Sequence, residues 1–216
     1  MNKMTPEHVA RALAARIPLY RWRRPNYQYV ALDALRLMWS ESHRTLLDIG
    51  GGTGVIAQAM KTFFPLEHVV SIDVEDRFLP RLDVETLVFD GVRLPFPDAS
   101  FDCVTLFNVL HHVPLAHRAP LLRECRRVVG DGPVYIKDHL SAGAIDNARL
   151  AALDLIGNAP FNGMVRARYL TEADWSALMR QAGFREEMRI SGRYREGWLA
   201  AIFSNRLELS MKWSAV

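Results

Sequence analysis

Residues 46–54, LLDIGGGTG, decide the fold of this chain. Residues 45–49 form a short apolar run that predicts a buried strand, and residues 55–63 have helical character. The glycines between the two segments permit positive φ angles and let a ligand approach the backbone closely. The stretch therefore predicts a strand, a glycine turn and a helix, with a nucleotide-like group lying against the turn.

Further apolar runs follow the turn and alternate with helical segments. The runs lie at residues 69–72, 86–89, 101–107 and 134–136, and a helix is predicted at residues 115–128. Strands separated by helices indicate a parallel sheet with right-handed crossovers. Residues 184–190 and 198–203 flank residues 191–197 and predict a closing antiparallel hairpin. We therefore expect an α/β fold, a Rossmann-like doubly wound sheet of about seven strands, mostly parallel with an antiparallel C-terminal strand, and helices on both faces.

Helical segments and one long loop surround the predicted sheet. Apolar side chains recur at helical spacing in residues 5–16, 27–38, 142–156 and 171–181. Between the second and third strands there is room for about two helical turns, around residues 77–82, and Pro80 limits them further. Residues 157–169 are rich in Gly, Pro and Asn, which is typical of a lid or binding loop.

Polar residues end the first four predicted strands, namely Asp48, Asp73, Asp90 and Asn108. In open α/β sheets the ligand lies at the carboxyl ends of the strands, so we expect these four side chains to converge. A carboxylate at the end of the second strand accepts hydrogen bonds from ribose hydroxyls in such sheets, which is the role predicted for Asp73. Asp90 is placed to accept from the adenine amine, and Gly91 leaves room beside the ring.

The glycine spacing argues against a pyrophosphate. Val55 stands where the dinucleotide fingerprint requires a small residue, and the Gly-Lys-Ser/Thr of a P-loop is missing. An adenosine without phosphates fits both the turn and the carboxylates.

Four segments together carry a family resemblance. LLDIGGGTG, SIDV, FDGVRLPFPDASFDCVTLFNVLHHV and LLRECRRVV, in this order, resemble the class I S-adenosylmethionine-dependent methyltransferases, type 11, which include ubiquinone- and menaquinone-biosynthesis enzymes. The similarity spans residues 46–137. The chain departs from the family pattern at Gly51, where such families often carry Cys or another small residue, and in the truncated helix after Asp73.

The resemblance implies roles for the residues of the glycine turn and the strand ends. Gly50, Gly52 and Gly54 are expected to line the methionine part of S-adenosylmethionine, while Asp73 holds the ribose and Asp90 with Gly91 holds the adenine. The remaining residues of the expected cofactor site are Asp48, Thr53, Val74 and Asn108.

Catalytic candidates follow the fifth predicted strand. Asp138 and His139 are placed there to act as a general base toward a hydroxyl or protonated amine, although a capped turn before the next helix explains them equally well. His111 and His112 are a further catalytic possibility, but the family resemblance implies that they pack the turn beside the cofactor. No metal is expected, because no Cys, His and Asp cluster completes a metal site.

Length and composition restrict the domain organisation and the partners. The chain has 216 residues, half of them hydrophobic, which suits a single domain, residues 1–216. Within it we expect an N-terminal helical lid, a cofactor-binding core, a helical substrate-side region and a C-terminal hairpin with a tail, at residues 1–40, 45–140, 141–183 and 184–216. No apolar stretch approaches the roughly 20 residues that cross a bilayer, so we expect no membrane insertion and a cytoplasmic location.

Charge gives a weak argument for a nucleic-acid partner. The net charge is +3, and arginines crowd into residues 16–24. No aromatic-interleaved basic surface accompanies them, so nucleic acid is not the expected partner.

The sequence thus predicts an enzyme that transfers a methyl group from S-adenosylmethionine to a small-molecule acceptor by in-line displacement. The alternatives are an RNA or protein methyltransferase and a cofactor-binding protein without catalysis. The sequence identifies neither the accepting atom nor the oligomeric state.

Overall fold

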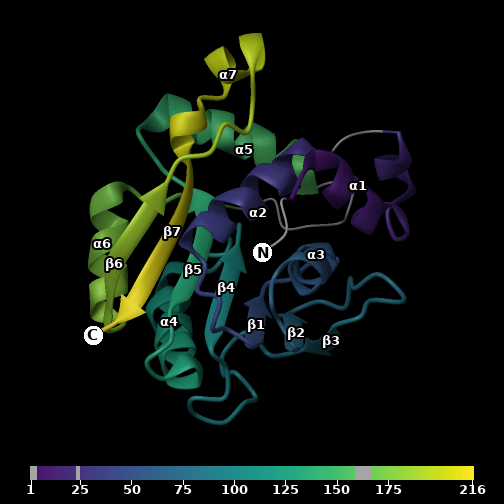
Figure 1. Cartoon of the computed structure of the whole chain (residues 1–216). Coiled ribbons are helices and arrows are strands. Elements are labelled where there is room, and N and C mark those ends of the chain that lie inside the picture. The colour runs from purple at the N-terminus through teal and green to yellow at the C-terminus, as the bar shows by residue number, and fades with distance from the viewer. Residues whose placement is uncertain (1–3, 23–24, 159–166) are drawn as a thin grey trace.

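A computed structural model describes residues 4–22, 25–158 and 167–216, and these residues contain one seven-stranded sheet with the strand order β3-β2-β1-β4-β5-β7-β6 (Figure 1). The strands are β1 Thr45–Ile49, β2 His68–Asp73, β3 Glu85–Val88, β4 Cys103–Phe107, β5 Val134–His139, β6 Phe184–Ile190 and β7 Glu208–Ala215. Strands β1 to β5 pair in parallel, whereas β7 runs antiparallel to both β5 and β6. The predicted α/β, Rossmann-like sheet with an antiparallel C-terminal strand is confirmed.

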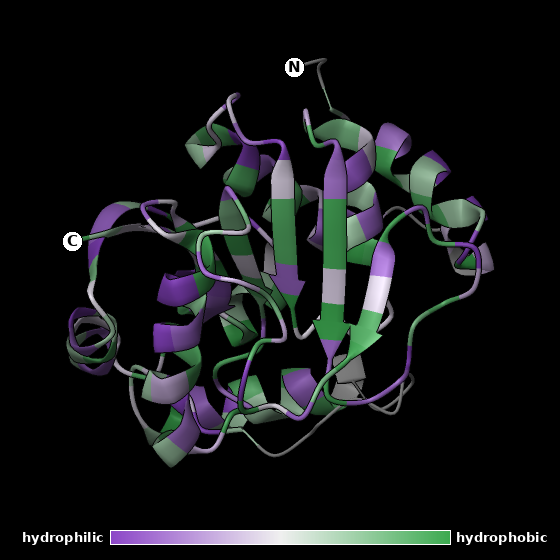
Figure 2. Cartoon of the chain, turned by 90° about the horizontal axis from the view of Figure 1, so that it is seen from below, coloured by the Kyte–Doolittle hydropathy of each residue, from purple (hydrophilic) through white to green (hydrophobic). Residues whose placement is uncertain are grey.

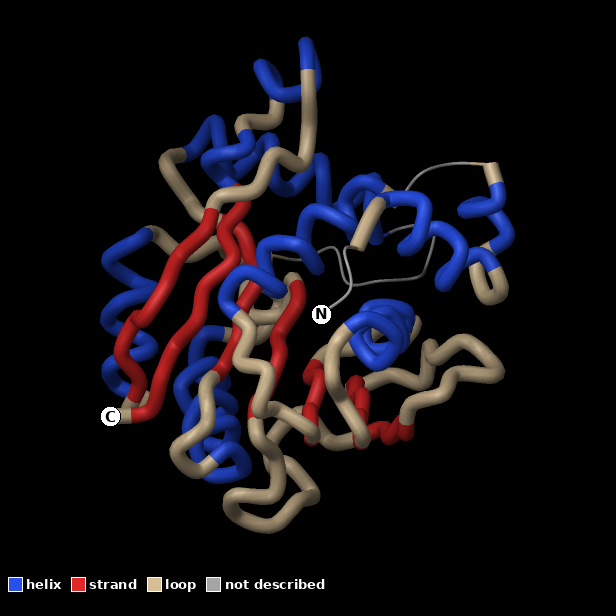
Figure 3. Tube along the Cα trace, viewed as in Figure 1, coloured by secondary structure: helices blue, strands red, loops and turns tan. Residues whose placement is uncertain are grey.

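Helices cover both faces of the sheet (Figure 3). They are α1 Pro6–Ala14, α2 Asn26–Met38, α3 Val55–Phe63, α4 Leu115–Val129, α5 Ala144–Asn158, α6 Glu172–Gln181 and α7 Gly197–Ile202, with short 3-10 helices at Pro18–Arg21 and Asn205–Leu207. Thr5 caps α1, and Thr171 caps α6 in a capping box with Asp174, as their sequences suggest. No helix in these described ranges is long and apolar enough to cross a membrane.

Alternation along the strands builds two separate hydrophobic cores. Leu46 of β1 points to one face and packs with residues of α1, α2 and α3. Leu47, its neighbour, points to the other face and packs with residues of α4 and α6. The central strands β1, β2 and β4 are therefore buried on both faces, which Figure 2 shows as hydrophobic colouring along the centre of the molecule.

The connection between β2 and β3 contains no helix. The two helical turns predicted around residues 77–82 are wrong, since this segment is a loop with a turn at Pro80 and Arg81. Arg81 takes the left-handed conformation with φ 64°, which ends any helix at this point. The connection beside the end of β2 is therefore a loop rather than a helix.

The C-terminal hairpin differs from the prediction in its second strand. Residues 198–203, expected as a strand, form most of α7, and the strand that pairs with β6 is β7. Leu209, Met211 and Trp213 are buried and alternate with polar residues, which is the period-2 signal of a strand. The apolar run before it starts at Gly197 and contains two alanines, which favour a helix.

Two further predictions bear on the site. Asp138 and His139 do not follow β5 but are its last two residues, and both are buried. Of the predicted loop at residues 157–169, residues 159–166 lie outside the part of the chain that the structure describes.

Candidate active site

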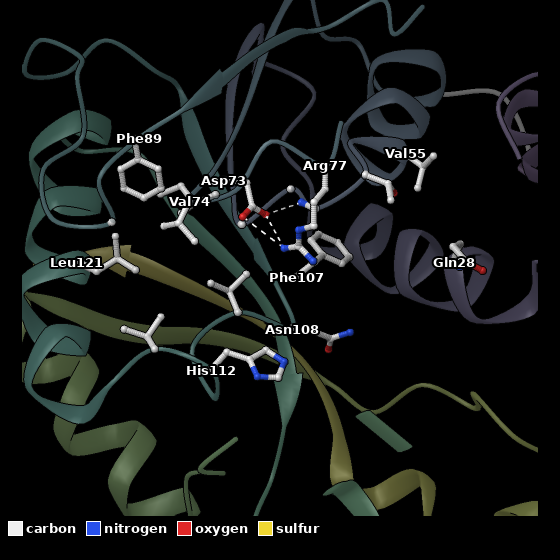
Figure 4. A pocket seen from close by; sticks show the side chains of 18 of the residues that line it. Gln28, Val55, Asp73, Val74, Arg77, Phe89, Phe107, Asn108, His112 and Leu121 are labelled. Carbon is white, nitrogen blue, oxygen red and sulfur yellow. Dashed lines mark hydrogen bonds and ion pairs between the residues drawn. The ribbon is translucent and has the colours of Figure 1, made fainter. Parts of the chain in front are cut away.

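A cavity of about 280 Å³ opens at the carboxyl ends of β1, β2 and β4 (Figure 4). The turn after β1 forms its floor, and residues that follow β2, β3 and β4 form its sides. Ile17, Tyr20 and Gln28 reach it from the N-terminal helical segment, which therefore lies over the cavity. All three belong to the N-terminal segment, residues 1–40, that was expected to form a helical lid, although the sequence does not show which of its side chains reach the cavity.

The glycine turn presents its backbone to the cavity. Gly50 and Gly52 have φ angles of +72° and +56°. The amides of Gly50 and Gly51 both donate to the Ile72 carbonyl, at 2.8 and 3.0 Å, which ties the turn to β2. A Cβ at Gly50 would lie 2.5 Å from Val109, so glycine is required for this close approach.

Asp73 is the carboxylate that the structure brings to the cavity. Its side chain is 3% exposed, and its Oδ2 accepts from the Gly52 amide at 2.7 Å. The Arg77 guanidinium, which also lines the cavity, lies 3.4 Å from both Asp73 oxygens (Figure 4). Asp73 therefore fixes the glycine turn, and its carboxylate lines the cavity beside that turn.

Asp48 lies inside the sheet and does not line the cavity. Its two oxygens accept from the hydroxyls of Ser71 and Thr105, each at 2.9 Å, on the two neighbouring strands. Burial raises the pKa of Asp48 to about 6 despite these two donors. Its side chain stabilises the strand ends below the glycine turn. The prediction that Asp48 joins the other strand-end residues in the cavity is therefore wrong.

Only some of the residues predicted to hold the adenine lie at the cavity. Gly91 and Val74 line the cavity. The exposed Asp90 carboxylate does not, and it accepts instead from the amides of Val92 and Arg93, which lower its pKa. Convergence of Asp90 with Asp73 is therefore also not observed.

Thr53 lines the cavity, whereas Gly54 stands behind the turn as the N-cap of α3 with φ +75°. A Cβ on Gly54 would lie 2.5 Å from Leu82, so this glycine admits the loop that replaces the expected helix.

Asn108 connects the cavity with a buried cluster of charges. It lines the cavity in the left-handed conformation, with φ 55°. Its amide donates to the Tyr27 hydroxyl at 2.6 Å, and its Oδ1 accepts from the Lys137 ammonium at 2.8 Å. That ammonium also contacts Glu208 and lies 4.8 Å from the centre of the Tyr27 ring and 5.1 Å from that of Tyr194.

Asp138 and His139 belong to this buried cluster and do not line the cavity. The Asp138 carboxylate accepts from the His139 amide at 2.7 Å, from the Leu110 amide at 3.2 Å, and contacts Nδ1 of His111. Burial opposes the charged form of Asp138, but the His111 ring outweighs it and lowers the pKa of Asp138. His139 lies 3.1 Å from Glu208.

His111 and His112 have different surroundings. His111 is 2% exposed and contacts two carboxylates, Asp138 through Nδ1 and Asp154 through Nε2 at 3.3 Å. Burial disfavours its charged form, but the two carboxylates prevail and raise the pKa of His111 to about 9. His112 lines the cavity. Asp154 reaches this cluster from α5, and no local sequence pattern marks it as a site residue.

The geometry fits S-adenosylmethionine. A Cβ at Gly52 would meet no atom within 4 Å, so the turn is open to a ligand there, and the Asp73 carboxylate offers acceptors beside it. A nucleoside that approaches this turn meets a hydrogen-bond acceptor suited to ribose hydroxyls.

Comparison with known proteins finds similarity to methyltransferases. The family model described as a methyltransferase domain matches residues 47–136. The ubiquinone/menaquinone biosynthesis C-methyltransferase UbiE of Pseudomonas putida (strain W619) is 30% identical over 177 residues, which cover 69% of this chain and 68% of that protein.

Solved structures share the fold. A chain of the complex between the Haloferax volcanii Trm112 methyltransferase activator and a putative methyltransferase superposes with a TM-score of 0.68 at 16% identity, covering 99% of both chains. An S-adenosylmethionine-dependent methyltransferase from Mesorhizobium loti superposes with a TM-score of 0.63 at 16% identity, covering 86% of this chain and 97% of that one.

The chain belongs to the class I S-adenosylmethionine-dependent methyltransferases. Within that class it is of the UbiE-like type. It is an enzyme whose methyl donor is S-adenosylmethionine and whose acceptor is a small molecule, and an RNA or protein acceptor is not favoured.

Proposed function

We propose that S-adenosylmethionine binds in the cavity at the carboxyl ends of β1, β2 and β4. Gly50, Gly52 and Thr53 would hold the methionine part against the turn, and Asp73 would accept from the ribose hydroxyls. The observation that carries this proposal is the Asp73 carboxylate, which already fixes the Gly52 amide at 2.7 Å on the cavity wall.

The adenine is assigned to the apolar side of the same cavity. Val74, Gly91 and Phe89 line it there, at the ends of β2 and β3. We infer that Asp90 acts by shaping the loop that carries Gly91, because its carboxylate holds the two amides that follow. Asp48 and Gly54 would support the glycine turn from behind.

Other cavity residues would orient the acceptor. When bound, S-adenosylmethionine supplies a methyl group that is already activated on a sulfonium. Tyr20, Gln28 and Asn108 would position the acceptor and exclude water, which is the main contribution such a transfer requires.

We infer that the acceptor is a small ring with a hydroxyl substituent, methylated on carbon. Relatives at about 30% identity are named as C-methyltransferases of ubiquinone/menaquinone biosynthesis. Some residues that line the cavity are not assigned to the cofactor. They include apolar, aromatic and polar side chains, namely Ile17, Tyr20, Phe107, Gln28 and His112. This mixture suits a flat ring that carries polar groups.

The roles of Asp138 and His139 are proposed as positioning ones. Asp138 holds the Leu110 amide and the His111 ring, so it fixes the segment after β4 that carries Asn108 and His112. Since neither Asp138 nor His139 lines the cavity, direct proton transfer from the acceptor to either is not part of this proposal.

Calorimetry with S-adenosylhomocysteine and, separately, NADH tests the cofactor assignment. Only the former should bind, with one site per chain. Activity should then be screened with labelled S-adenosylmethionine against small hydroxylated aromatic compounds. Binding of NADH, or of neither compound, would refute the cofactor assignment, whereas label found only on oxygen or nitrogen would refute the assignment of a carbon acceptor.

A further inference from the structure

We propose that His111, His112 and Asp154 form a binding site for a divalent transition-metal ion at the edge of the cavity. Each offers one ligand atom, and these atoms all lie within 4.8 Å of one another. His111 and His112 follow β4, whereas Asp154 comes from α5, so the fold brings together residues far apart in the sequence. Small side-chain adjustments bring three such atoms to metal–ligand distances of about 2.0–2.2 Å.

His111 has a buried nitrogen directed at this site. Its Nε2 lies 3.3 Å from an Asp154 oxygen, which is an ion-pair contact without hydrogen-bond geometry. A buried polar atom without a hydrogen bond is costly unless another partner satisfies it. A metal ion between Nε2 and the Asp154 carboxylate is such a partner.

The contacts behind His111 and Asp154 prepare both as metal ligands. Asp138 accepts from the Leu110 and His139 amides, so its carboxylate serves as an acceptor and His111 must donate to it through Nδ1. In the neutral ring this leaves the lone pair on Nε2. A carboxylate behind a ligating histidine is the usual support in metal sites, because it fixes the tautomer and the ring orientation.

The Tyr169 hydroxyl donates to Asp154 and orients that carboxylate in the same way.

The ligand types define the class of ion. Two imidazoles and one carboxylate suit Zn²⁺, Fe²⁺ or Co²⁺, whereas Mg²⁺ and Ca²⁺ prefer oxygen ligands. A proton on Nε2 of His111 competes with the metal ion for this site, because the Asp138 and Asp154 carboxylates stabilise both the protonated ring and a bound metal ion.

The position suggests what the ion would do. Figure 4 shows the His112 ring among the side chains that line the cavity, so an open coordination position would face the acceptor. This role rests on the proposed function. The ion would bind the acceptor hydroxyl and lower its pKa, so that its proton leaves to solvent and the ring carbon becomes nucleophilic. The ring hydrogen would leave as a proton after the methyl transfer, which restores the aromatic ring.

Metal titration of the chelator-stripped full chain tests the site without an acceptor. Calorimetry with ZnCl₂ should show one tight site, and CoCl₂ should give a visible absorption band typical of nitrogen and oxygen ligands, while MgCl₂ should not bind. His112→Gln and Asp154→Asn should each weaken Zn²⁺ binding by at least about tenfold. His117→Gln, which removes an exposed histidine of α4, is the matched control and should bind Zn²⁺ like the wild type.

Three results would overturn the site: no Zn²⁺ or Co²⁺ binding by the wild type, an affinity that neither His112→Gln nor Asp154→Asn lowers, or an equal loss in His117→Gln. Measurement of both cluster variants keeps the test decisive if one of them fails to fold. Binding of S-adenosylhomocysteine by the same stripped protein checks the proposed function separately, because the cofactor residues are not among the metal ligands.

Discussion

Replacement of Asp73 by asparagine should weaken the binding of S-adenosylhomocysteine about 10- to 100-fold. The asparagine carbonyl can still accept from the Gly52 amide, which lies 2.7 Å from the present carboxylate, so the glycine turn should keep its shape. The second oxygen, which accepts from the Glu75 amide at 3.2 Å, is replaced by an NH₂ group, and the negative charge beside the proposed ribose site is lost. A hydrogen bond to a charged group contributes about 1.5–3 kcal/mol, and each 1.4 kcal/mol corresponds to tenfold in affinity.

Isothermal calorimetry on the wild type and on Asp73→Asn measures this change directly. Asp83→Asn is the control, because Asp83 is exposed and does not line the cavity, and its affinity should equal that of the wild type. Circular dichroism should confirm that each variant is folded. An Asp73→Asn protein that is folded and binds S-adenosylhomocysteine as tightly as the wild type would show that Asp73 does not hold the ribose.

Three further predictions concern stability. Gly51→Ala should lower the free energy of unfolding in urea by about 2–4 kcal/mol, because the new Cβ would lie 1.9 Å from the Ser71 hydroxyl and break its hydrogen bond to Asp48; an unchanged urea midpoint would contradict this. Thr171→Ala should cost about 1 kcal/mol in the same assay through the lost cap of α6, and no loss would argue against the capping box. The pKa of His111 is raised to about 9 in the fold, above the ordinary 6.5, so its charge stabilises the fold fully below about pH 6.5 and this contribution is lost as the pH rises through about 9. In the presence of a chelator, the wild type should therefore lose on the order of 3 kcal/mol more than His111→Gln between about pH 6 and pH 10, and parallel pH profiles would contradict the shift.

Local patterns predicted most of the fold. The strand β1 and the helix α3 have the predicted boundaries, because an apolar run and an amphipathic segment are separated by glycines, which favour a turn. The alternation of Leu209, Met211 and Trp213 marks β7, but the apolar run at residues 198–203 precedes it and also fits a strand, so the sequence predicts the second strand of the hairpin too early.

The candidate site was only partly predictable. A strand end shows where a side chain starts but not which way it points, so Asp73 reaches the cavity while Asp48 forms hydrogen bonds inside the sheet. Asp154 could not be anticipated from the sequence, because its contact with His111 depends on how α5 packs against the end of β4. Long-range contacts of this kind follow from the packing and leave no local pattern in the sequence.

A crystal structure of the protein with S-adenosylhomocysteine tests the central claim most directly. We predict ligand density in the cavity, with the amino-acid part against Gly50 and Gly52, the ribose hydroxyls within hydrogen-bond distance of Asp73, and the adenine beside Gly91. Ligand bound elsewhere on the chain, or ribose hydroxyls out of reach of the Asp73 carboxylate, would contradict it.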